Sequence, residues 1–484
     1  MPDPSPSDHA DEPPVTLVVD LDGSLLRTDS LDEELVTIAR DRPWRLPHVA
    51  SRLASGRAAF KAEVGRHAAL AVDRLPYREA VLDLVHEVRG RGGRAVLATA
   101  ADEHIARAVA DHLGCFDDHL ASADGVNLKG EAKLGALRDR LGDEPFDYVG
   151  DHAADLPIWK AARRSYVVAP SKKLLAAMRG ADLDVHRLGD APGPVGPLLA
   201  AVRPKQWCKN LLLATPMLAG HAITAPNLAL LAAAFVAFCA AASSVYLIND
   251  LHDLDADRGH PTKRRRPIAD GRLSIRAAAI ASAVLIMLAA VVSAAVSAGF
   301  VLVVLGYFAA SLTYTGVIKR VALLDVVWLA GLYVYRIIAG GLAIDVFPSH
   351  WLLTFAMFFF LSLALSKRYT ELRRAGDADQ LARSGRGYLA QDIDLLRLLG
   401  PLCGALAVLV VCLYLNSAAV VALYPSPAWL WLAVPLLFYW IARFWLYTQR
   451  DAMTDDPVVF ALTDAPTYLM VAVIAGLGML AAWA

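Results

Sequence analysis

Three aspartates and a basic run mark residues 249–271 as the part of the sequence best suited to chemistry. Asp250, Asp253 and Asp257 are spaced i, i+3 and i+7, which would place their carboxylates on one face of a helix. Like charges on one face repel, so we expect a compensating cation, and Mg²⁺ prefers such oxygen ligands together with substrate phosphates. The segment therefore predicts a site where a metal and cations neutralise a departing diphosphate. The side chains that follow directly are hydrogen-bond donors suited to phosphate, namely His260, Lys263, Arg264, Arg265 and Arg266.

A second set of polar residues follows short apolar runs nearer the N-terminus. Asp20 and Asp22 lie in DLDGS after one such run, and Asp151 and Asp155 lie in GDHAADLP after another. Ligands of open α/β sheets usually bind at the carboxyl edge of the strands, where these residues should lie. One carboxylate can attack phosphorus there while another acts as acid and base. Two further candidates, one after an apolar run and one at a helix start, are Thr99 and Lys133.

The elements that must position this second set alternate between strands and helices. Residues 15–20, 94–98 and 146–150 have the short apolar pattern of buried parallel strands, with helical patterns between them. We predict an α/β domain over residues 15–188, with a helical cap at about 30–80. The acidic, Pro-rich residues 1–14 predict a flexible tail, and the Gly/Pro-rich residues 189–202 predict a linker.

The rest of the chain, residues 203–484, predicts an all-α membrane domain. Hydrophobic residues make up 56% of the sequence, above the roughly 45–50% of soluble domains. Apolar stretches long enough to cross a bilayer recur in this half. Of the spans, the first is the weakest, because Pro216 and His221 interrupt it. We predict about nine, near residues 208–223, 227–248, 274–294, 297–315, 322–343, 351–366, 396–416, 427–446 and 465–483.

Basic residues predict the orientation of these spans. Lys and Arg precede the first span and fill the loops after the second, fourth and sixth, whereas the loops after the first, third, fifth and seventh have none. Basic loops stay on the cytoplasmic side, so both candidate sites should face the cytoplasm of an inner-membrane protein. The net charge of −1 averages two unlike halves and predicts no nucleic-acid partner. The five cysteines lack the spacing of a zinc site or a disulfide framework.

The motif NDxxDxxxD followed by HPxKxxRPIAxG resembles the first aspartate-rich motif of the UbiA superfamily, over residues 200–484. Within it, RPKQWCKN at residues 203–210 and YTGVIKRVALLD at residues 314–325 are similar to the decaprenyl-phosphate phosphoribosyltransferase branch. Only Asp325 remains of the second motif, which is richer in aspartate in aromatic prenyltransferases. The resemblance implies further contacts to phosphates, ribose or metal by Lys205, Lys209, Asn210, Tyr246, Asn249, Lys319 and Asp325.

This likeness implies a reaction. The donor would be 5-phosphoribosyl 1-diphosphate, and the acceptor a polyprenyl phosphate whose oxygen attacks ribose C1. Positioning and electrostatics would dominate, because the nucleophile is already an anion. The alternative is an aromatic prenyltransferase that uses a prenyl diphosphate and a hydroxybenzoate-like acceptor, with an independent or structural soluble domain. A lipid carrier with a regulatory soluble module is a third hypothesis.

The order of motifs in residues 15–180 resembles the haloacid dehalogenase superfamily. The resemblance implies a nucleophile at Asp20 and an acid/base at Asp22, with Mg²⁺ held by these aspartates, Asp151 and Asp155. Thr99 and Lys133 would stabilise the phosphoryl oxygens, and Lys129 is a second candidate for the lysine. Since the membrane half would make a lipid-linked 5-phosphoribose, the phosphatase could remove its 5-phosphate, and fusion would raise the local concentration of that product.

Overall fold

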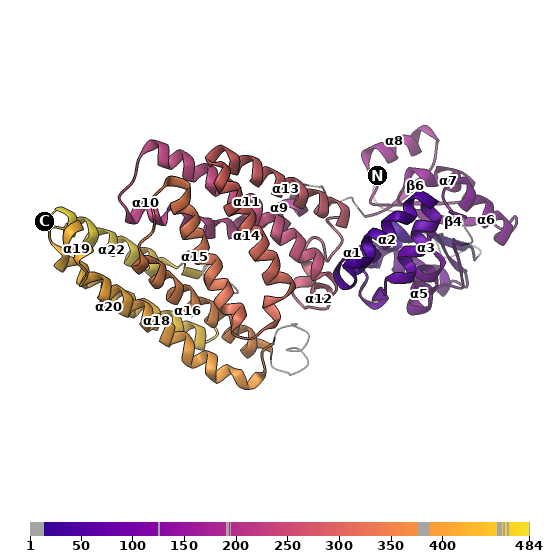
Figure 1. The fold of residues 1–484 in the computed structure, drawn as a ribbon. Helices are drawn as coiled ribbons and strands as arrows, with labels where there is room; N and C mark the ends of the chain where they lie inside the picture. The colour runs from indigo at the N-terminus through magenta and orange to yellow at the C-terminus, as the bar shows by residue number, and fades with distance from the viewer. Residues whose placement is uncertain are drawn as a thin grey trace. The chain divides into compact units, whose positions relative to one another are not determined.

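The computed structural model describes residues 14–123, 126–189, 193, 195–375, 387–452, 457, 460–461 and 464–483 (Figure 1). The chain divides into two compact units. Unit 1 comprises Met1–Ala201 and Asp250–Ile280, and unit 2 comprises Val202–Asn249 and Ala281–Ala484. The predicted flexible tail lies almost wholly outside the described residues.

Unit 1 is built on a parallel six-stranded sheet with the strand order β3-β2-β1-β4-β5-β6. β1 pairs with β2 on one side and with β4 on the other, so the carboxyl ends of these three strands meet at one edge. This arrangement confirms the predicted parallel α/β fold. The strands are β1 (Thr16–Val19), β2 (Ala95–Asp102), β3 (Asp118–Ser122), β4 (Phe146–Gly150), β5 (Ser165–Val168) and β6 (Val185–Leu188).

Helices cover both faces of this sheet because alternate side chains of each strand point to opposite faces. On β1, Leu17 and Val19 join one buried cluster, and Val18 joins another. Burial on both faces explains the continuous apolar runs of these strands. One face packs against α4 (Glu79–Gly90) and α5 (Glu103–Leu113). The other packs against α6 (Glu131–Leu141), α7 (Leu156–Ala161) and α8 (Lys172–Gly180).

The predicted cap is a group of short helices inserted after β1. Ile38, Val49 and Val64 form its own small core. Asp29 begins its first helix, because its side chain accepts a hydrogen bond from the backbone N–H of Leu31 at 3.0 Å. The cap contains α1 (Ser30–Asp41), α2 (Leu46–Ser51) and α3 (Arg57–His67).

The second part of unit 1, residues 250–280, is named here the aspartate segment. It contains α12 (Leu254–Arg258) and the single turn η8 (Lys263–Arg265). The segment connects the long helix α11 (Ala225–His252) to α13 (Ile275–Val296). Residues of unit 1 are therefore joined by the chain itself to two apolar helices.

Eight helices of the described residues are long and apolar enough to cross a membrane, so the chain is an integral membrane protein. Of the nine stretches predicted, eight are long continuous helices among the described residues. Residues 208–223 instead form η7 (Pro204–Ala214) and the short α10 (Thr215–Ala219), with a proline near the start of each. The eight spans contain α11, α13, α14 (Ala298–Gly316), α15 (Leu324–Ile344), α16 (His350–Ala375), α18 (Ile393–Leu415), α20 (Ala433–Gln449) and α22 (Ala465–Trp483).

Close packing of small residues joins the later spans of unit 2. Gly400 of α18 lies against the Trp445 ring of α20, where a Cβ atom would approach a ring carbon to 1.9 Å. The Trp445 indole N–H donates to the Ser362 hydroxyl at 2.9 Å, and that hydroxyl donates to the Gly400 carbonyl at 2.7 Å. Glycine at position 400 is therefore required by this contact between α16, α18 and α20.

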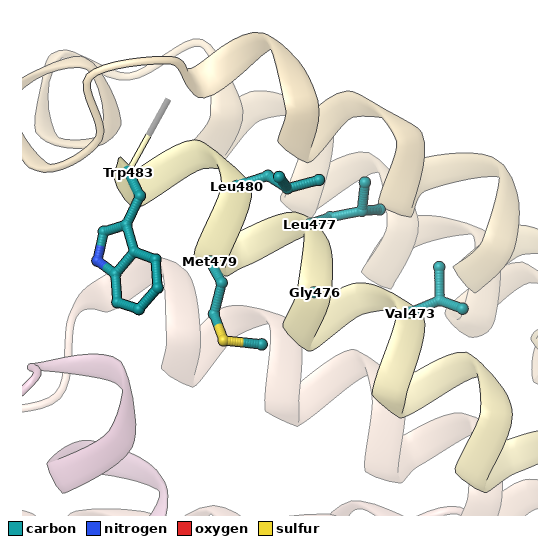
Figure 2. Close-up of a pocket in the computed structure, with 6 residues that line it drawn as sticks. All are labelled: Val473, Gly476, Leu477, Met479, Leu480 and Trp483. Carbon is teal, nitrogen blue, oxygen red and sulfur yellow. The ribbon is translucent and has the colours of Figure 1, made fainter.

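A hollow of about 490 Å³ lies along α22, and its lining comes from that helix alone (Figure 2). Its side chains are apolar, and Figure 2 shows Met479 and Trp483 among them. With no charged group in the lining, the hollow offers nothing to hold a phosphate or a metal. It is an apolar surface of a membrane span, and the chemistry must be sought elsewhere.

Candidate active sites

Four of the predicted phosphatase residues meet at the carboxyl edge of the sheet in unit 1. Asp20 follows β1, and Asp151 follows the neighbouring strand β4. The ammonium group of Lys133, at the start of α6, donates to Asp20 Oδ1 at 2.7 Å and lies 3.7 Å from Asp155 Oδ1. Asp20, Asp151 and Asp155 each offer a carboxylate oxygen, and these oxygens lie within 4.8 Å of one another. The donor set is all oxygen and therefore fits Mg²⁺.

The pKa values of this site show how crowded its negative charge is. Burial, followed by the charge of Asp20, raises the pKa of Asp151 to about 8. Burial also raises the pKa of Asp155 to about 6, although the adjacent Lys133 lowers it. A bound divalent cation would relieve this repulsion between carboxylates.

Asp22, the predicted acid/base, is held separately from the other carboxylates. Its Oδ1 accepts a hydrogen bond of 2.7 Å from the backbone N–H of Ser30, at the start of α1. Burial, and then the charge of Asp29, raises the pKa of Asp22 to about 7. A carboxyl group with that pKa can both donate and accept a proton near neutral pH.

Gly23, which directly follows Asp22, is required for the close approach of the DLDGS turn to Asp151. Gly23 has a φ of +77°, which glycine adopts readily. A Cβ atom there would lie 2.1 Å from Asp151 Oδ2. The turn DLDGS can therefore bring Asp20 next to Asp151 only with glycine at this position.

The remaining predicted residues of the sheet edge differ in placement. Thr99 is fully buried in β2, and its hydroxyl accepts a hydrogen bond from the Ala101 N–H at 3.0 Å. Lys129 is exposed, so Lys133 is the lysine that the structure brings to Asp20. The sequence analysis missed Tyr148, whose hydroxyl accepts a 3.2 Å hydrogen bond from Lys133. Its place two residues before the end of a predicted strand was the available signal.

The aspartate segment departs from the predicted single helical face. Helix α11 ends at His252 and α12 begins at Leu254, so the helix breaks at Asp253. Asp250 and Asp257 are nevertheless brought together, because Nη1 of Arg266 lies 3.0 Å from Asp250 Oδ1 and 2.6 Å from Asp257 Oδ2. Burial raises the pKa of Asp257 to about 6, despite the opposing charge of Arg266.

The metal role predicted for the three aspartates stays a prediction. In the part of the chain that the structure describes, two groups of three ligating side chains have their atoms within 4.8 Å, and the three aspartates are not one of them. A guanidinium compensates two of the carboxylates instead. The other basic residues predicted here lie at or near the surface, with Lys263 and Arg264 exposed and His260 half-buried.

The second of those two groups lies on the cap and has a different environment. It comprises His48, Glu63 and His67. Arg66 lies 3.2 Å from the Glu63 carboxylate, and Arg45 lies 3.4 Å from the His67 ring. Arg66 compensates the charge of the carboxylate, and both guanidinium groups would repel a cation.

Within unit 2, Asn210 belongs to a buried polar cluster. The cation at its centre is Arg336, which the sequence analysis missed. Arg336 of α15 is 5% exposed, and its Nε donates to Asn210 Oδ1 at 2.9 Å. Its other amino groups donate to the Tyr307 hydroxyl at 2.6 Å and to the Leu332 carbonyl at 2.7 Å. These acceptors are neutral, and Arg336 forms no ion pair with a carboxylate of the described residues. An arginine inside an apolar 21-residue stretch was the signal for it.

Aromatic rings gather more positive charge near this cluster. The guanidinium of Arg336 lies 5.5 Å from the centre of the Tyr333 ring, and Lys209 Nζ lies 5.9 Å from the same ring. Arg203 lies 5.1 Å from the ring of Tyr246. Two predicted residues, Lys209 and Tyr246, thus take part in cation–π contacts. The other predicted residues of unit 2 are Lys205, which is exposed, and Asn249 and Lys319, which are half-buried.

Asp325 is placed as a structural anchor. It is fully buried, and its carboxylate accepts hydrogen bonds of 2.5 Å from Arg368 Nε and from the Tyr388 hydroxyl. Arg368 also donates to the Tyr314 hydroxyl at 2.9 Å. Tyr388 in turn accepts from the N–H of Leu323, whose φ is +64°. The contact of Asp325 with ribose or metal stays a prediction.

Among the described residues, eight apolar helices and an α/β sheet with three carboxylates at its edge define a membrane protein fused to a hydrolase-type domain. The comparisons with known proteins agree. The chain belongs to the UbiA prenyltransferase family, whose model matches residues 211–464, and it carries a haloacid dehalogenase-like hydrolase domain matched over residues 17–160.

Named relatives cover different parts of the chain. An uncharacterized protein, y4nM, of Sinorhizobium fredii is 38% identical over 95% of this chain and 89% of its own length. The decaprenyl-phosphate phosphoribosyltransferase of Mycolicibacterium smegmatis is 44% identical over 37% of this chain and 58% of its own length. A UbiA homolog from Archaeoglobus fulgidus, solved with GPP and Mg²⁺, is 17% identical with a TM-score of 0.43, over 58% of this chain and 99% of that one.

Proposed function

We propose that the UbiA-family part of the chain, residues 211–464, transfers 5-phosphoribose from 5-phosphoribosyl 1-diphosphate to a polyprenyl phosphate. The observation that carries this proposal is the 44% identity, over 186 residues, to a decaprenyl-phosphate phosphoribosyltransferase. The chain spans 58% of that relative's length, so its substrates are transferred here as part of the proposal. Both substrates are phosphorylated, so the charges of the described residues must suit two anions.

The buried cation of unit 2 supports an anionic ligand. A guanidinium inside an apolar helix is costly unless a negative group compensates it. Arg336 has neutral acceptors among the described residues, and Lys209 lies over the same tyrosine ring. We infer that a substrate phosphate supplies the missing negative charge, with Asn210 orienting the Arg336 fork.

The aspartate segment supplies the opposite pattern, because Arg266 bridges two carboxylates. We propose that Arg266 and the exposed Lys263 and Arg264 bind the diphosphate of the donor. Asp250 and Asp257 then accept hydrogen bonds from ribose hydroxyls. The donor is expected as its Mg²⁺ complex, since this ion usually binds together with substrate phosphates.

The reaction exchanges one C–O bond for another. An oxygen of the lipid phosphate bonds to ribose C1 while the bond from C1 to the diphosphate oxygen breaks, and the electron pair leaves with the diphosphate. The attacking oxygen carries no proton that must be removed, so no general base is required. The work of the protein is to align the two anions and to offset their charge.

We further propose that the haloacid dehalogenase-like domain removes the 5-phosphate of the product. Asp20 attacks phosphorus while the bond from phosphorus to the ribose oxygen breaks, Lys133 offsets the charge of the phosphoryl oxygens, and Asp22 protonates the leaving oxygen. Water that loses a proton to Asp22 then attacks the aspartyl-phosphate and releases phosphate, which restores both carboxyl groups. The pKa of Asp22, raised to about 7 by burial, suits that proton transfer. Mg²⁺ held by Asp20, Asp151 and Asp155 would shield the phosphoryl charge when bound. Basic residues of the aspartate segment favour a cytoplasmic location for both reactions.

Mass analysis of lipid products tests both steps. The purified full-length protein receives polyprenyl phosphate with 5-phosphoribosyl 1-diphosphate, or a prenyl diphosphate with a hydroxybenzoate. We expect a lipid-linked ribose from the first mixture in wild type, and the same lipid with its 5-phosphate retained in Asp20→Asn. Product only from the prenyl donor would establish the aromatic prenyltransferase alternative. A retained 5-phosphate in wild type would refute the coupled phosphatase.

A further inference from the structure

Within unit 1, ion pairs join helix α1 of the cap to the aspartate segment. Five side chains in or just before α1 pair with four of the segment. Arg27 lies 2.8 Å from Asp270, and Arg276 lies 2.6 Å from Asp32 and 3.0 Å from Asp29. The other two pairs are Glu33 with Arg258 and Arg40 with Asp255. The contacts therefore run along the whole length of α1.

The pair at the centre is the most buried and the best aligned. Arg258 donates from Nη1 to Glu33 Oε2 at 3.0 Å and from Nη2 to Glu33 Oε1 at 2.6 Å. The side chains are 5% and 2% exposed, respectively. Arg258 Nε donates to the carbonyl of Ala269 at 3.0 Å, across the segment. This two-pronged geometry fixes direction as well as distance, which a single surface ion pair does not.

Neighbouring residues of α12 connect this pair to the proposed donor site. Arg258 contacts Glu33, and the preceding residue, Asp257, contacts Arg266. Helix α12 has only five residues, so a rotation that breaks one contact also moves the other. At its N-terminus, α1 holds the phosphatase residue Asp22 through the Ser30 N–H. Helix α1 thus contacts Asp22 of the phosphatase site directly, and it contacts Arg258, the neighbour of Asp257 in the proposed donor site.

We propose that Glu33 is a positioning residue for the transferase, acting through Arg258 to hold Asp257 and Arg266 in the arrangement that binds the donor. The phosphatase-like domain is then part of the transferase site's support, in addition to any hydrolysis it performs. The inference rests on the proposed function for its kinetic readout. The α1–segment contact itself can be measured without any activity.

The kinetic test uses charge exchange in the full-length protein. Glu33→Arg and Arg258→Glu each place two like charges face to face, and we expect the KM for 5-phosphoribosyl 1-diphosphate to rise tenfold or more, with kcat changed less than threefold. The double variant restores an ion pair of opposite direction, so its KM should return to within threefold of wild type. Arg258→Lys keeps the charge without the fork and should give an intermediate KM.

A matched control separates positioning from loss of folding. Arg163 forms a similar two-pronged pair with Asp147 of β4, at 2.9 and 2.8 Å, outside the aspartate segment. Arg163→Gln should leave the donor KM unchanged. An unchanged KM in Arg258→Lys and both reversals would overturn the proposal. So would a reversal defect that the double variant does not relieve.

Cross-linking tests the contact when no turnover is available. The paired side chains meet at their tips, so Glu33→Cys and Arg258→Cys should be joined in membranes by a short bismaleimide cross-linker rather than by a direct disulfide. Mass analysis of the linked peptides detects the product. The matched pair Glu33→Cys with Arg163→Cys should not be joined. Absence of the first cross-link overturns the contact. If the link forms but wild type uses no ribosyl donor, the proposed function fails and the contact stands.

Discussion

Replacement of Arg336 by glutamine should impair transfer strongly while leaving the protein folded. Glutamine keeps a hydrogen-bonding end but removes the positive charge that we assign to a substrate phosphate. It cannot donate to Asn210 Oδ1 and the Tyr307 hydroxyl together, as the guanidinium does at 2.9 and 2.6 Å. Arg336→Lys keeps the charge and loses the fork.

The size of the effect follows from these contacts. A hydrogen bond to a charged group contributes about 1.5–3 kcal/mol. Loss of the phosphate contact and of the orientation by Asn210 should therefore raise the barrier by about 3 kcal/mol, which is on the order of a 100-fold fall in kcat/KM. Arg336→Lys should lose about half of that free energy, or on the order of tenfold in kcat/KM.

Radiolabelled donor and polyprenyl phosphate in detergent provide the assay, with the KM for each substrate measured separately. Arg443→Gln is the matched control. Arg443 also lies on a membrane span, but Asp464 accepts two hydrogen bonds from it at 2.7 and 2.8 Å. Arg443 has no assigned substrate contact and Asp464 compensates its charge, so Arg443→Gln should retain kcat/KM within threefold. If Arg336→Gln keeps wild-type kcat/KM, our account of the buried charge is wrong.

Three further predictions concern stability and the phosphatase-like site. Arg368→Gln leaves the carboxylate of Asp325 buried without its cation, so we expect about 3–5 kcal/mol less stability and a lower Tm in detergent; an unaltered Tm would contradict the anchoring role. Burial raises the pKa of Glu34 to about 8, so its neutral form is favoured when folded and stability falls as pH rises from about 4.5 through 8. The free energy of unfolding of Glu34→Gln relative to wild type should therefore increase between pH 5 and 8, by up to about 1.4 kcal/mol per pH unit. The difference in Tm between the two proteins should grow over this range, and a constant difference would refute the shift. Gly23→Ala should abolish hydrolysis of p-nitrophenyl phosphate, because its methyl group would meet Asp151 Oδ2; activity above a tenth of wild type would show that the turn can adjust.

The sequence predicted the soluble fold well because its signals are local. A buried parallel strand followed at once by a functional carboxylate leaves a distinct pattern, and Asp20 and Asp151 do lie at one sheet edge. Long apolar helices were equally clear. The stretch near residues 208–223 is not one long helix, because prolines near the starts of η7 and α10 divide it and hydropathy does not measure helix continuity.

The candidate sites were predicted less completely, because helix register and tertiary partners are not local. The i, i+3, i+7 pattern assumed an unbroken helix, but α11 ends before Asp253. Arg266 was expected to bind phosphate. Its contacts with Asp250 and Asp257, which lie 16 and 9 residues earlier in the chain, depend on how the segment folds back on itself. Two side-chain partners of Arg336, Tyr307 and Asn210, lie 29 and 126 residues away along the chain, so no local pattern could indicate them.

The ion pairs along α1 also predict how chimeras and truncations of the chain would behave. A shortened chain that begins after residue 201 would keep Asp255, Arg258, Asp270 and Arg276 but lose every α1 residue that neutralises them. Fusing the soluble half to another member of the family would leave the α1 side chains without their partners, unless these four positions were transferred as well. They should therefore change together, and natural fusions should differ from stand-alone enzymes at these positions before they differ at Asp250 or Asp257.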